Sequence, residues 1–116
     1  DKSWLNTDIR GYELNNKKLG IIGYGRLGKM VAKYGKAFGM KVSAYDIDPQ
    51  KYDQHIIPVK LTQLLKESDI ISVNAKLNKT SFRLIDSDEI SLMKKGVILV
   101  NTARGEIINS EANLEE

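Results

Sequence analysis

Three glycines and an aspartate in this chain have the types and spacing of a site for a dinucleotide. Gly23, Gly25 and Gly28 are spaced as G-x-G-x-x-G, between an apolar run and a helical pattern. The first glycine permits a tight turn with backbone angles that a side chain would resist. The second lets the backbone approach a pyrophosphate, and the third lets the next helix pack closely on the strands. The helix N-terminus then offers N–H groups and a partial positive charge to the phosphates.

Asp46 ends the second apolar run, at the separation expected of a ribose-binding acid. A carboxylate there can accept both hydroxyls of an adenosine ribose and repels the 2′-phosphate of NADP, so it favours NAD. Arg26 lies within the glycine loop, where its guanidinium could reach the pyrophosphate. The alternative interpretation is a plain turn followed by an ordinary loop aspartate. We expect NAD as the cofactor and no metal site.

The histidine and the apolar stripe of the first predicted helix are expected to have structural roles rather than to contact a ligand. His55, the single histidine, follows the second strand and should lie at the surface, far from a nicotinamide. Met30 and Tyr34 belong to an apolar stripe at helical spacing over residues 27–38, which predicts that they pack in or near the core. Gly39 should end that helix as a C-cap.

The chain alternates strands and helices in the way that such a site requires. Residues 1–18 are expected to be a lead-in, in which Trp4, Leu5 and Ile9 form one face of a short helix broken at Gly11. The dinucleotide-binding unit follows over residues 19–116. Strands are predicted over 19–22, 41–45, 56–59, 69–74 and 96–101, and helices over 27–38, after Thr62 as N-cap, over 85–93 and after Ser110. Pro58 confines the third strand to a sheet edge.

This alternation predicts an α/β fold with a doubly wound parallel sheet of strand order 3-2-1-4-5. It is a three-layer α/β/α arrangement of the Rossmann type, expected to be truncated at its C-terminal end. The carboxyl ends of the strands meet at one edge of such a sheet, and ligands bind there. The loops after residues 74 and 101 therefore belong to the same edge as the glycine loop.

The composition agrees with a globular protein and excludes several classes. The 116 residues are 41% hydrophobic and 28% charged, with a net charge of +3 and no cysteine. Disulfides, thiolate metal sites and cysteine nucleophiles are therefore excluded. The basic residues are scattered, which argues against a nucleic-acid partner, and no apolar run is long enough to span a membrane. We expect a cytoplasmic location.

Longer motifs resemble one family, the D-isomer-specific 2-hydroxyacid dehydrogenases, in their NAD-binding domain. The similarity begins at Gly11-x-Glu13-Leu14 and covers nearly the whole chain. It runs through the glycine loop with Gly25-Arg26-Leu27-Gly28, then Phe38-Gly39-Met40, Tyr45-Asp46 and Leu92-Met93-Lys94-Lys95-Gly96. It ends at Asn101-Thr102-Ala103-Arg104-Gly105, the most specific of these runs.

The resemblance implies particular roles. Arg104 corresponds to the family's catalytic arginine, which binds the substrate carboxylate; a guanidinium can hold a carboxylate through paired hydrogen bonds. Arg26 and Leu27 correspond to the pair that contacts the pyrophosphate. Ala75 corresponds to a position whose backbone lies along the cofactor. Thr102, Ala103 and Arg104 correspond to the segment near the nicotinamide ribose.

The implied function is hydride transfer between NAD(H) and a D-2-hydroxyacid or 2-oxoacid, in a parent protein that we expect to be a homodimer. The family's acid/base histidine and its partner glutamate should lie beyond residue 116, and the substrate-binding domain is expected to be absent. The chain alone should therefore be inactive. Two alternatives remain at this point: an NADH-responsive regulator or corepressor of the same fold, and an adenosylhomocysteinase-like hydrolase with tightly bound NAD.

Overall fold

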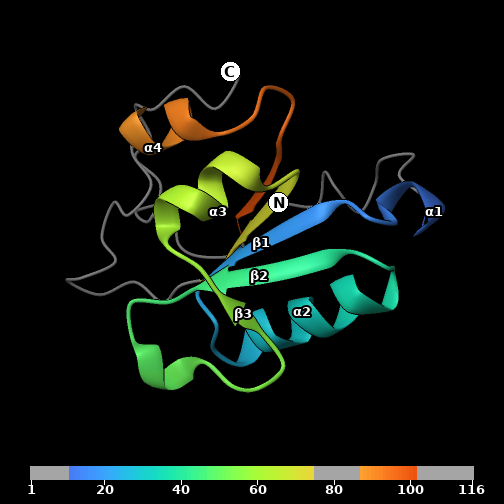
Figure 1. Ribbon diagram of the computed structural model, residues 1–116, viewed down its shortest axis with the longest axis vertical. Coiled ribbons are helices and arrows are strands. Elements are labelled where there is room, and N and C mark those ends of the chain that lie inside the picture. Colours follow the sequence, from blue (N-terminus) through green and yellow to red (C-terminus); the bar gives the residue numbers. More distant parts are fainter. Residues whose placement is uncertain (1–10, 75–86, 102–116) are drawn as a thin grey trace.

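A five-stranded parallel sheet organises the protein, and the computed structural model describes residues 11–74 and 87–101 of it (Figure 1). The strands run in the order β3-β2-β1-β4-β5, which confirms the predicted order. The strands are β1 (Lys18–Ile22), β2 (Lys41–Tyr45), β3 (Ile57–Pro58), β4 (Ile70–Val73) and β5 (Ile98–Asn101). The helices are α1 (Gly11–Leu14), α2 (Arg26–Ala37), α3 (Leu61–Glu67) and α4 (Ser87–Leu92), with a 3₁₀ turn, η1, at Pro49–Lys51.

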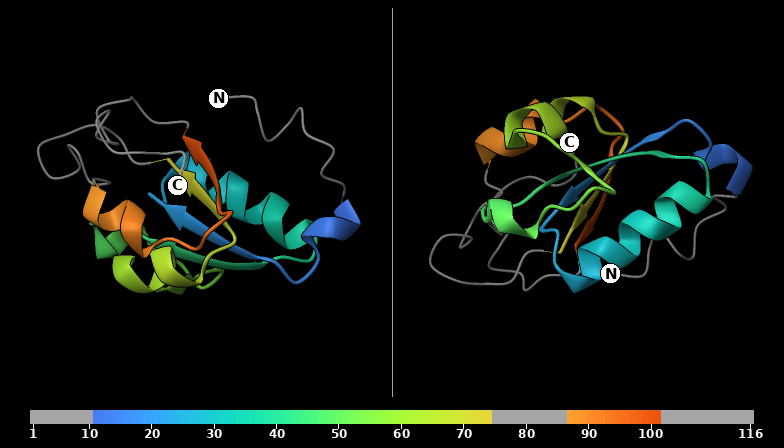
Figure 2. Two further views of the ribbon diagram at one scale, coloured as in Figure 1. Left: turned by 90° about the horizontal axis from the view of Figure 1, so that it is seen from above. Right: turned by 60° about the horizontal axis from the view of Figure 1, so that its bottom comes forward.

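Helices cover both faces of the sheet, so the fold has the three predicted layers. Helix α2 lies on one face, and α3 and α4 lie on the other (Figures 1 and 2). Side chains alternate along β1: Leu19 and Ile21 join the cluster that includes Ala32 of α2, whereas Ile22 packs with Leu64 of α3. Both faces of the central strands are therefore buried, as their continuous apolar runs predict.

The register of the sheet brings the ends of four strands to one edge. Ile22 of β1 pairs with Tyr45 of β2 and with Val73 of β4, and Val73 in turn pairs with Asn101 of β5. The residues that directly follow β1, β2, β4 and β5 therefore leave the sheet at the same carboxyl edge. This edge carries the glycine loop.

Helix α2 packs through a different face from the one that its apolar stripe predicts. Its buried residues are Gly28, Ala32 and Gly35. Met30 and Tyr34 are 47% and 59% exposed, so the prediction that they lie in or near the core is wrong. Because the buried face is lined by small residues, the helix backbone lies close to the sheet and the large side chains point away from it. The C-cap residue is Phe38, one residue before the predicted one, and Gly39 follows it with φ +80°, the left-handed conformation in which a glycine commonly ends a helix.

Several predicted boundaries need correction. Gly11 is itself helical and is the first residue of α1, which is possible because a single glycine costs a helix only about 1 kcal/mol. Lys60 is the N-cap residue of α3, and Thr62 lies inside that helix. The strand predicted over 41–45 matches β2 at both ends, and the remaining elements differ from the predicted ranges by at most two residues at either end. The predictions for Trp4, Leu5, Ile9 and Ser110 fall outside the described residues.

In the described ranges, 11–74 and 87–101, no helix is long and apolar enough to cross a membrane.

Candidate functional site

The glycine loop connects β1 to α2 and has the geometry that its spacing predicts. Gly23 has φ +94°, in the left-handed region that favours glycine, and its N–H donates to the carbonyl of Tyr45 (2.8 Å). At Gly28, a Cβ would lie 2.1 Å from the carbonyl oxygen of Gly23. The structure therefore confirms the close packing expected at Gly28, which involves the turn itself.

Gly25 differs from Gly28 because it faces open space. A Cβ at this position would meet no atom within 4 Å. Gly25 is also the N-cap of α2, whose twelve residues give it a helix dipole. The N–H groups of the first helical turn have no intrahelical acceptor. A bare backbone beside free N–H groups fits a pyrophosphate, and Arg26 and Leu27, both exposed, are the first two residues of the helix.

Asp46 is positioned across the carboxyl edge from the glycine loop, directly after β2. Its Oδ2 accepts the N–H of Tyr24 (2.7 Å), and its Oδ1 accepts the N–H of Asp48 (2.8 Å). An ionised carboxylate has about four acceptor positions, so each oxygen can accept a further hydrogen bond. The side chain is half-buried and fits a ligand with neighbouring hydroxyl groups, such as a ribose.

Sequence reasoning missed a cluster of polar and aromatic residues around Asp46. The Tyr24 hydroxyl donates to Oδ1 of Asp53 (3.0 Å), and the Tyr52 hydroxyl contacts the backbone of Asp46. Lys29 places its Nζ 5.1 Å from the centre of the Tyr24 ring. The one available signal was a tyrosine between two glycines of the loop, where a small residue would suffice.

The electrostatics of this cluster follow from burial and from paired charges. Burial, the hydrogen bond to Asp53 and the negative charge of Asp53 together raise the pKa of Tyr24 to about 12. Desolvation acts to raise the pKa of Asp53. The backbone N–H of His55, the Tyr24 hydroxyl and nearby positive charge outweigh it and hold the pKa below its ordinary value. Tyr24 therefore stays a neutral donor and Asp53 a charged acceptor at neutral pH.

His55 forms its hydrogen bonds in the described structure through its backbone. Its side chain is exposed, as predicted, and its backbone N–H donates to Oδ1 of Asp53 (3.0 Å). Its carbonyl oxygen accepts a hydrogen bond from the Lys36 ammonium of α2. These backbone contacts help to hold the segment before β3 against α2.

Four of the predicted site residues lie outside the described residues: Ala75, Thr102, Ala103 and Arg104. In the sequence, Ala75 comes two residues after the end of β4, and Thr102 directly follows the end of β5. Both strands end at the edge that carries the glycine loop. The roles of these four residues remain predictions.

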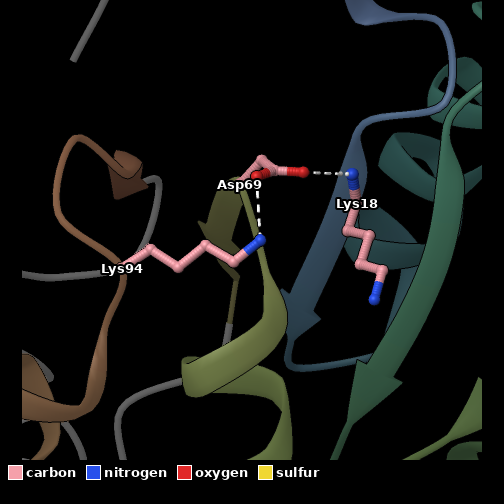
Figure 3. A network of polar contacts seen from close by, with 3 residues as sticks. All are labelled: Lys18, Asp69 and Lys94. Atoms are coloured by element: carbon pink, nitrogen blue, oxygen red, sulfur yellow. Dashed lines mark hydrogen bonds and ion pairs between the residues drawn. The ribbon is translucent and has the colours of Figure 1, made fainter.

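The opposite edge of the sheet holds a structural network (Figure 3). Oδ2 of Asp69 accepts the N–H of Lys18 (2.8 Å), and Oδ1 lies 3.1 Å from the Nζ of Lys94. The hydrogen bond from the backbone N–H of Lys18 lowers the pKa of Asp69, and the hydrogen bond and positive charge of Lys94 act in the same direction. Partial burial acts to raise this pKa, but the net effect holds it below its ordinary value. A cavity of about 260 Å³ lies beside this network, between Leu14 and Ile98. Because these contacts join the amino ends of β1, β4 and β5, we interpret them as fixing strand register.

Comparisons with known proteins agree on one family. The family model for the D-isomer specific 2-hydroxyacid dehydrogenase, NAD binding domain, matches residues 1–116. A hydroxypyruvate reductase of Thermotoga maritima is 45% identical over 113 residues, which are 97% of this chain and 37% of that protein. A glyoxylate reductase of Thermofilum pendens is 37% identical, over 97% of this chain and 34% of its own. The chain thus spans about a third of the length of these curated relatives.

Solved structures give the same result. The apo-structure of D-lactate dehydrogenase from Escherichia coli matches with a TM-score of 0.79 and 34% identity, over 85% of this chain and 32% of that one. An NAD-complexed D-isomer specific 2-hydroxyacid dehydrogenase from Lactobacillus delbrueckii ssp. bulgaricus matches with a TM-score of 0.78 and 34% identity, over 86% and 30%. Neither alternative weighed from the sequence, the corepressor or the adenosylhomocysteinase-like hydrolase, finds support among these relatives.

Proposed function

The chain belongs to the D-isomer specific 2-hydroxyacid dehydrogenase family as its NAD-binding domain, and from this premise we propose that the whole protein is an NAD-dependent oxidoreductase. It transfers hydride between NAD(H) and a D-2-hydroxyacid or the corresponding 2-oxoacid. The observation that carries the proposal is the juxtaposition of a bare glycine loop with a half-buried carboxylate, Asp46, whose oxygens each retain an acceptor position.

Each part of this edge has a task in the proposed reaction. Backbone N–H groups around Gly25 and the first turn of α2 bind the pyrophosphate, while Gly23 and Gly28 keep the turn tight and the helix close. Arg26 adds a positive charge and Leu27 an apolar contact. The carboxylate of Asp46 accepts the adenosine ribose hydroxyls and disfavours a 2′-phosphate. When bound, NAD supplies the hydride acceptor or donor.

The substrate contacts that we assign to this chain follow β5. Arg104 binds the substrate carboxylate through paired hydrogen bonds, which orients C2 of the substrate for hydride transfer. The backbone of Ala75, Thr102 and Ala103 lies along the cofactor. A histidine and a glutamate outside this chain complete the acid–base machinery, and a second domain completes the substrate site. Residues 19–116 form the dinucleotide-binding unit, with residues 1–18 as a lead-in.

The full-length protein assayed with NADH against a panel of 2-oxoacids tests this function directly. We expect turnover of at least one small 2-oxoacid, with NADH preferred over NADPH. Arg104→Met should lower kcat/KM by at least a hundredfold, since a bidentate contact to the reacting substrate is lost. No reduction of any 2-oxoacid by the wild type would contradict the proposal, and an unchanged kcat/KM in the variant would contradict the role of Arg104.

Asp46→Ala tests cofactor choice separately from the reaction. Wild-type protein should bind NAD more tightly than NADP, and the variant should show a smaller ratio because the repulsion of the 2′-phosphate is removed. Calorimetric titration of both cofactors measures the ratio. An unchanged ratio would refute the assignment of Asp46.

We also propose that the full-length protein is a homodimer that buries the exposed apolar stripe of α2. Met30, Tyr34 and Phe38 are 47%, 59% and 47% exposed on one helix, and clustered apolar surface of this kind marks interfaces. Light scattering should give a dimer mass for the wild type and a monomer mass for Met30→Lys/Tyr34→Lys. Lys33→Glu, on the polar side, is the control. A wild-type monomer would exclude this proposal.

A cytoplasmic location stays a prediction. Fractionation of cells that express the tagged full-length protein should place it with the cytosolic markers, and recovery in the membrane fraction would contradict it.

A further inference from the structure

The carboxylate of Asp46 is oriented by the protein itself. Its two oxygens accept N–H groups from two different segments, Tyr24 in the glycine loop and Asp48 in its own loop. Hydrogen bonds to an ionised acceptor are stronger than neutral ones, so both bonds restrict rotation of the side chain. The acceptor positions that remain for a ligand are therefore fixed in direction.

Tyr52 fastens the backbone that carries this carboxylate. Its hydroxyl accepts the N–H of Asp46 (2.7 Å) and donates to the carbonyl of the same residue (3.2 Å). One side chain thus satisfies both main-chain groups of Asp46. The ring is half-buried against the cluster that contains Tyr24, with the two ring centres 6.5 Å apart. Packing therefore holds the hydroxyl in place.

Tyr24 connects the other end of the same loop to the glycine loop. Its ring is 2% exposed, and its hydroxyl donates to Asp53, seven residues after Asp46. Asp53 also accepts the N–H of His55, so its carboxylate is held from two sides. The backbone N–H and the side-chain hydroxyl of Tyr24 therefore contact opposite ends of the segment 46–53.

From these contacts we infer that Tyr52 and the Tyr24–Asp53 pair are positioning residues, which set the Asp46 carboxylate for recognition of the adenosine ribose hydroxyls. The inference rests on the proposed function, in which Asp46 is the ribose-binding group. A carboxylate fixed before binding loses less side-chain freedom when the ligand arrives, so affinity for the adenosine half of the cofactor is higher. The effect is specific to ligands that present the ribose hydroxyls.

A merely structural role predicts something different. If the hydroxyls of Tyr24 and Tyr52 only stabilised the loop, their removal would lower the affinity for adenine nucleotides by the same factor whether or not the nucleotide carries a 2′-hydroxyl. A positioning role predicts that the loss depends on that hydroxyl. ADP and 2′-deoxy-ADP carry the same base and pyrophosphate and differ only in this group, so they are matched probes.

The experiment is calorimetric titration of the full-length protein with ADP and with 2′-deoxy-ADP. We expect the wild type to bind ADP about tenfold more tightly, as for one hydrogen bond to a charged group. Tyr52→Phe keeps the ring and removes the hydroxyl, and should reduce this ratio to about threefold or less. Tyr45→Phe removes a hydroxyl from a residue packed on the other face of the sheet, and should leave the ratio unchanged.

The role of the Tyr24–Asp53 pair can be tested with a disruptive and a conservative substitution of Asp53. Asp53→Ala should reduce the ratio of the affinities for ADP and 2′-deoxy-ADP, as Tyr52→Phe does. Asp53→Asn keeps an Oδ1 that can accept hydrogen bonds from the Tyr24 hydroxyl and the His55 N–H, and it should keep the wild-type ratio. Thermal unfolding of every variant shows whether the fold is retained, and Asp53→Asn remains informative if Asp53→Ala does not fold.

The outcomes separate this inference from the function on which it rests. A wild type that prefers ADP, with a ratio unchanged in Tyr52→Phe and Asp53→Ala, overturns the positioning role and leaves the proposed function standing. If these variants lose affinity for ADP and for 2′-deoxy-ADP by the same factor, the ratio is unchanged and the positioning role is likewise overturned. A wild type that binds neither NAD nor ADP overturns both proposals.

Discussion

Alanine at position 25 and alanine at position 28 should damage this protein in different ways. At Gly28 a Cβ would lie 2.1 Å from the Gly23 carbonyl oxygen and 3.3 Å from Cγ2 of Ile21. A normal contact needs at least 3.4 Å, so α2 must move by about 1 Å. Overpacking of this kind costs about 1–3 kcal/mol, offset by up to about 1 kcal/mol from the higher helix propensity of alanine. Gly28→Ala should therefore lower the melting temperature by several degrees.

Gly25→Ala should cost at most about 1 kcal/mol of stability, because the new methyl group would meet no protein atom within 4 Å and only the N-cap preference is lost. The backbone angles, φ −88° and ψ −154°, are in the extended region open to L-residues, and alanine at the N-cap costs about 1 kcal/mol or less relative to glycine. The methyl group would instead stand beside the N–H groups assigned to the pyrophosphate. We expect NAD affinity to fall at least tenfold.

Two measurements on each variant check this contrast. Circular dichroism during heating, without ligand, measures stability, and calorimetric titration with NAD measures affinity. Gly28→Ala should lower both the melting temperature and the NAD affinity, whereas Gly25→Ala should lower mainly the NAD affinity. Wild-type NAD affinity in Gly25→Ala would refute the placement of the pyrophosphate. A wild-type melting temperature in Gly28→Ala would refute the packing argument.

Three further predictions concern stability and titration. The folded state lowers the pKa of Asp69 below 3.8, so the charged side chain should stabilise the fold above that pH and cease to do so as the pH falls through the folded pKa. Asp69→Asn should cost about 1 kcal/mol or less at pH 6, and urea unfolding should show this cost shrinking as the pH falls below 3.8; a cost that does not change with pH would contradict the prediction. Absorbance at 295 nm should show a tyrosine that titrates near pH 12, and this titration should be missing in Tyr24→Phe. The stability that the neutral Tyr24 hydroxyl contributes should be lost as the pH rises from 10 to 12. Leu64→Ala, at a side chain 1% exposed, should cost about 2–4 kcal/mol by thermal unfolding, and a loss below 1 kcal/mol would contradict its core position.

The strand order was predictable because local signals and general rules agreed. Apolar runs separated by helical patterns require right-handed crossovers, and the glycine loop marks the first strand of the doubly wound sheet. Pro58 lacks a backbone N–H and so belonged at an edge, where β3 is found. Element ends were less predictable: Thr62 is a better N-cap by residue type than Lys60, yet α3 begins at Leu61, two residues earlier than a cap at Thr62 would place its start.

The packing face of α2 was not predictable from its apolar period. The large apolar residues of this helix indicate one face, whereas Gly28, Ala32 and Gly35 indicate a neighbouring one. Hydrophobicity alone favours the first, but the distance between helix and sheet is set by the smallest residues. At Gly35 a Cβ would lie 2.6 Å from Cδ2 of Leu19, so the helix approaches the sheet more closely than a bulky face would permit.

The surroundings of Asp46 show why an acid at the right separation is only part of a ribose site. The sequence placed the carboxylate after β2, but Tyr24 and Asp53, which lie 22 residues before it and 7 after it, could be connected to it only through the fold. Truncation of Asp46 to alanine removes the repulsion of a 2′-phosphate and, at the same time, the acceptor for the N–H of Tyr24 in the glycine loop. The loop to which we assign the pyrophosphate and the acid to which we assign the ribose therefore share a hydrogen bond. A change of cofactor preference made at Asp46 alone must also weaken the pyrophosphate contacts, unless another acceptor is supplied for Tyr24.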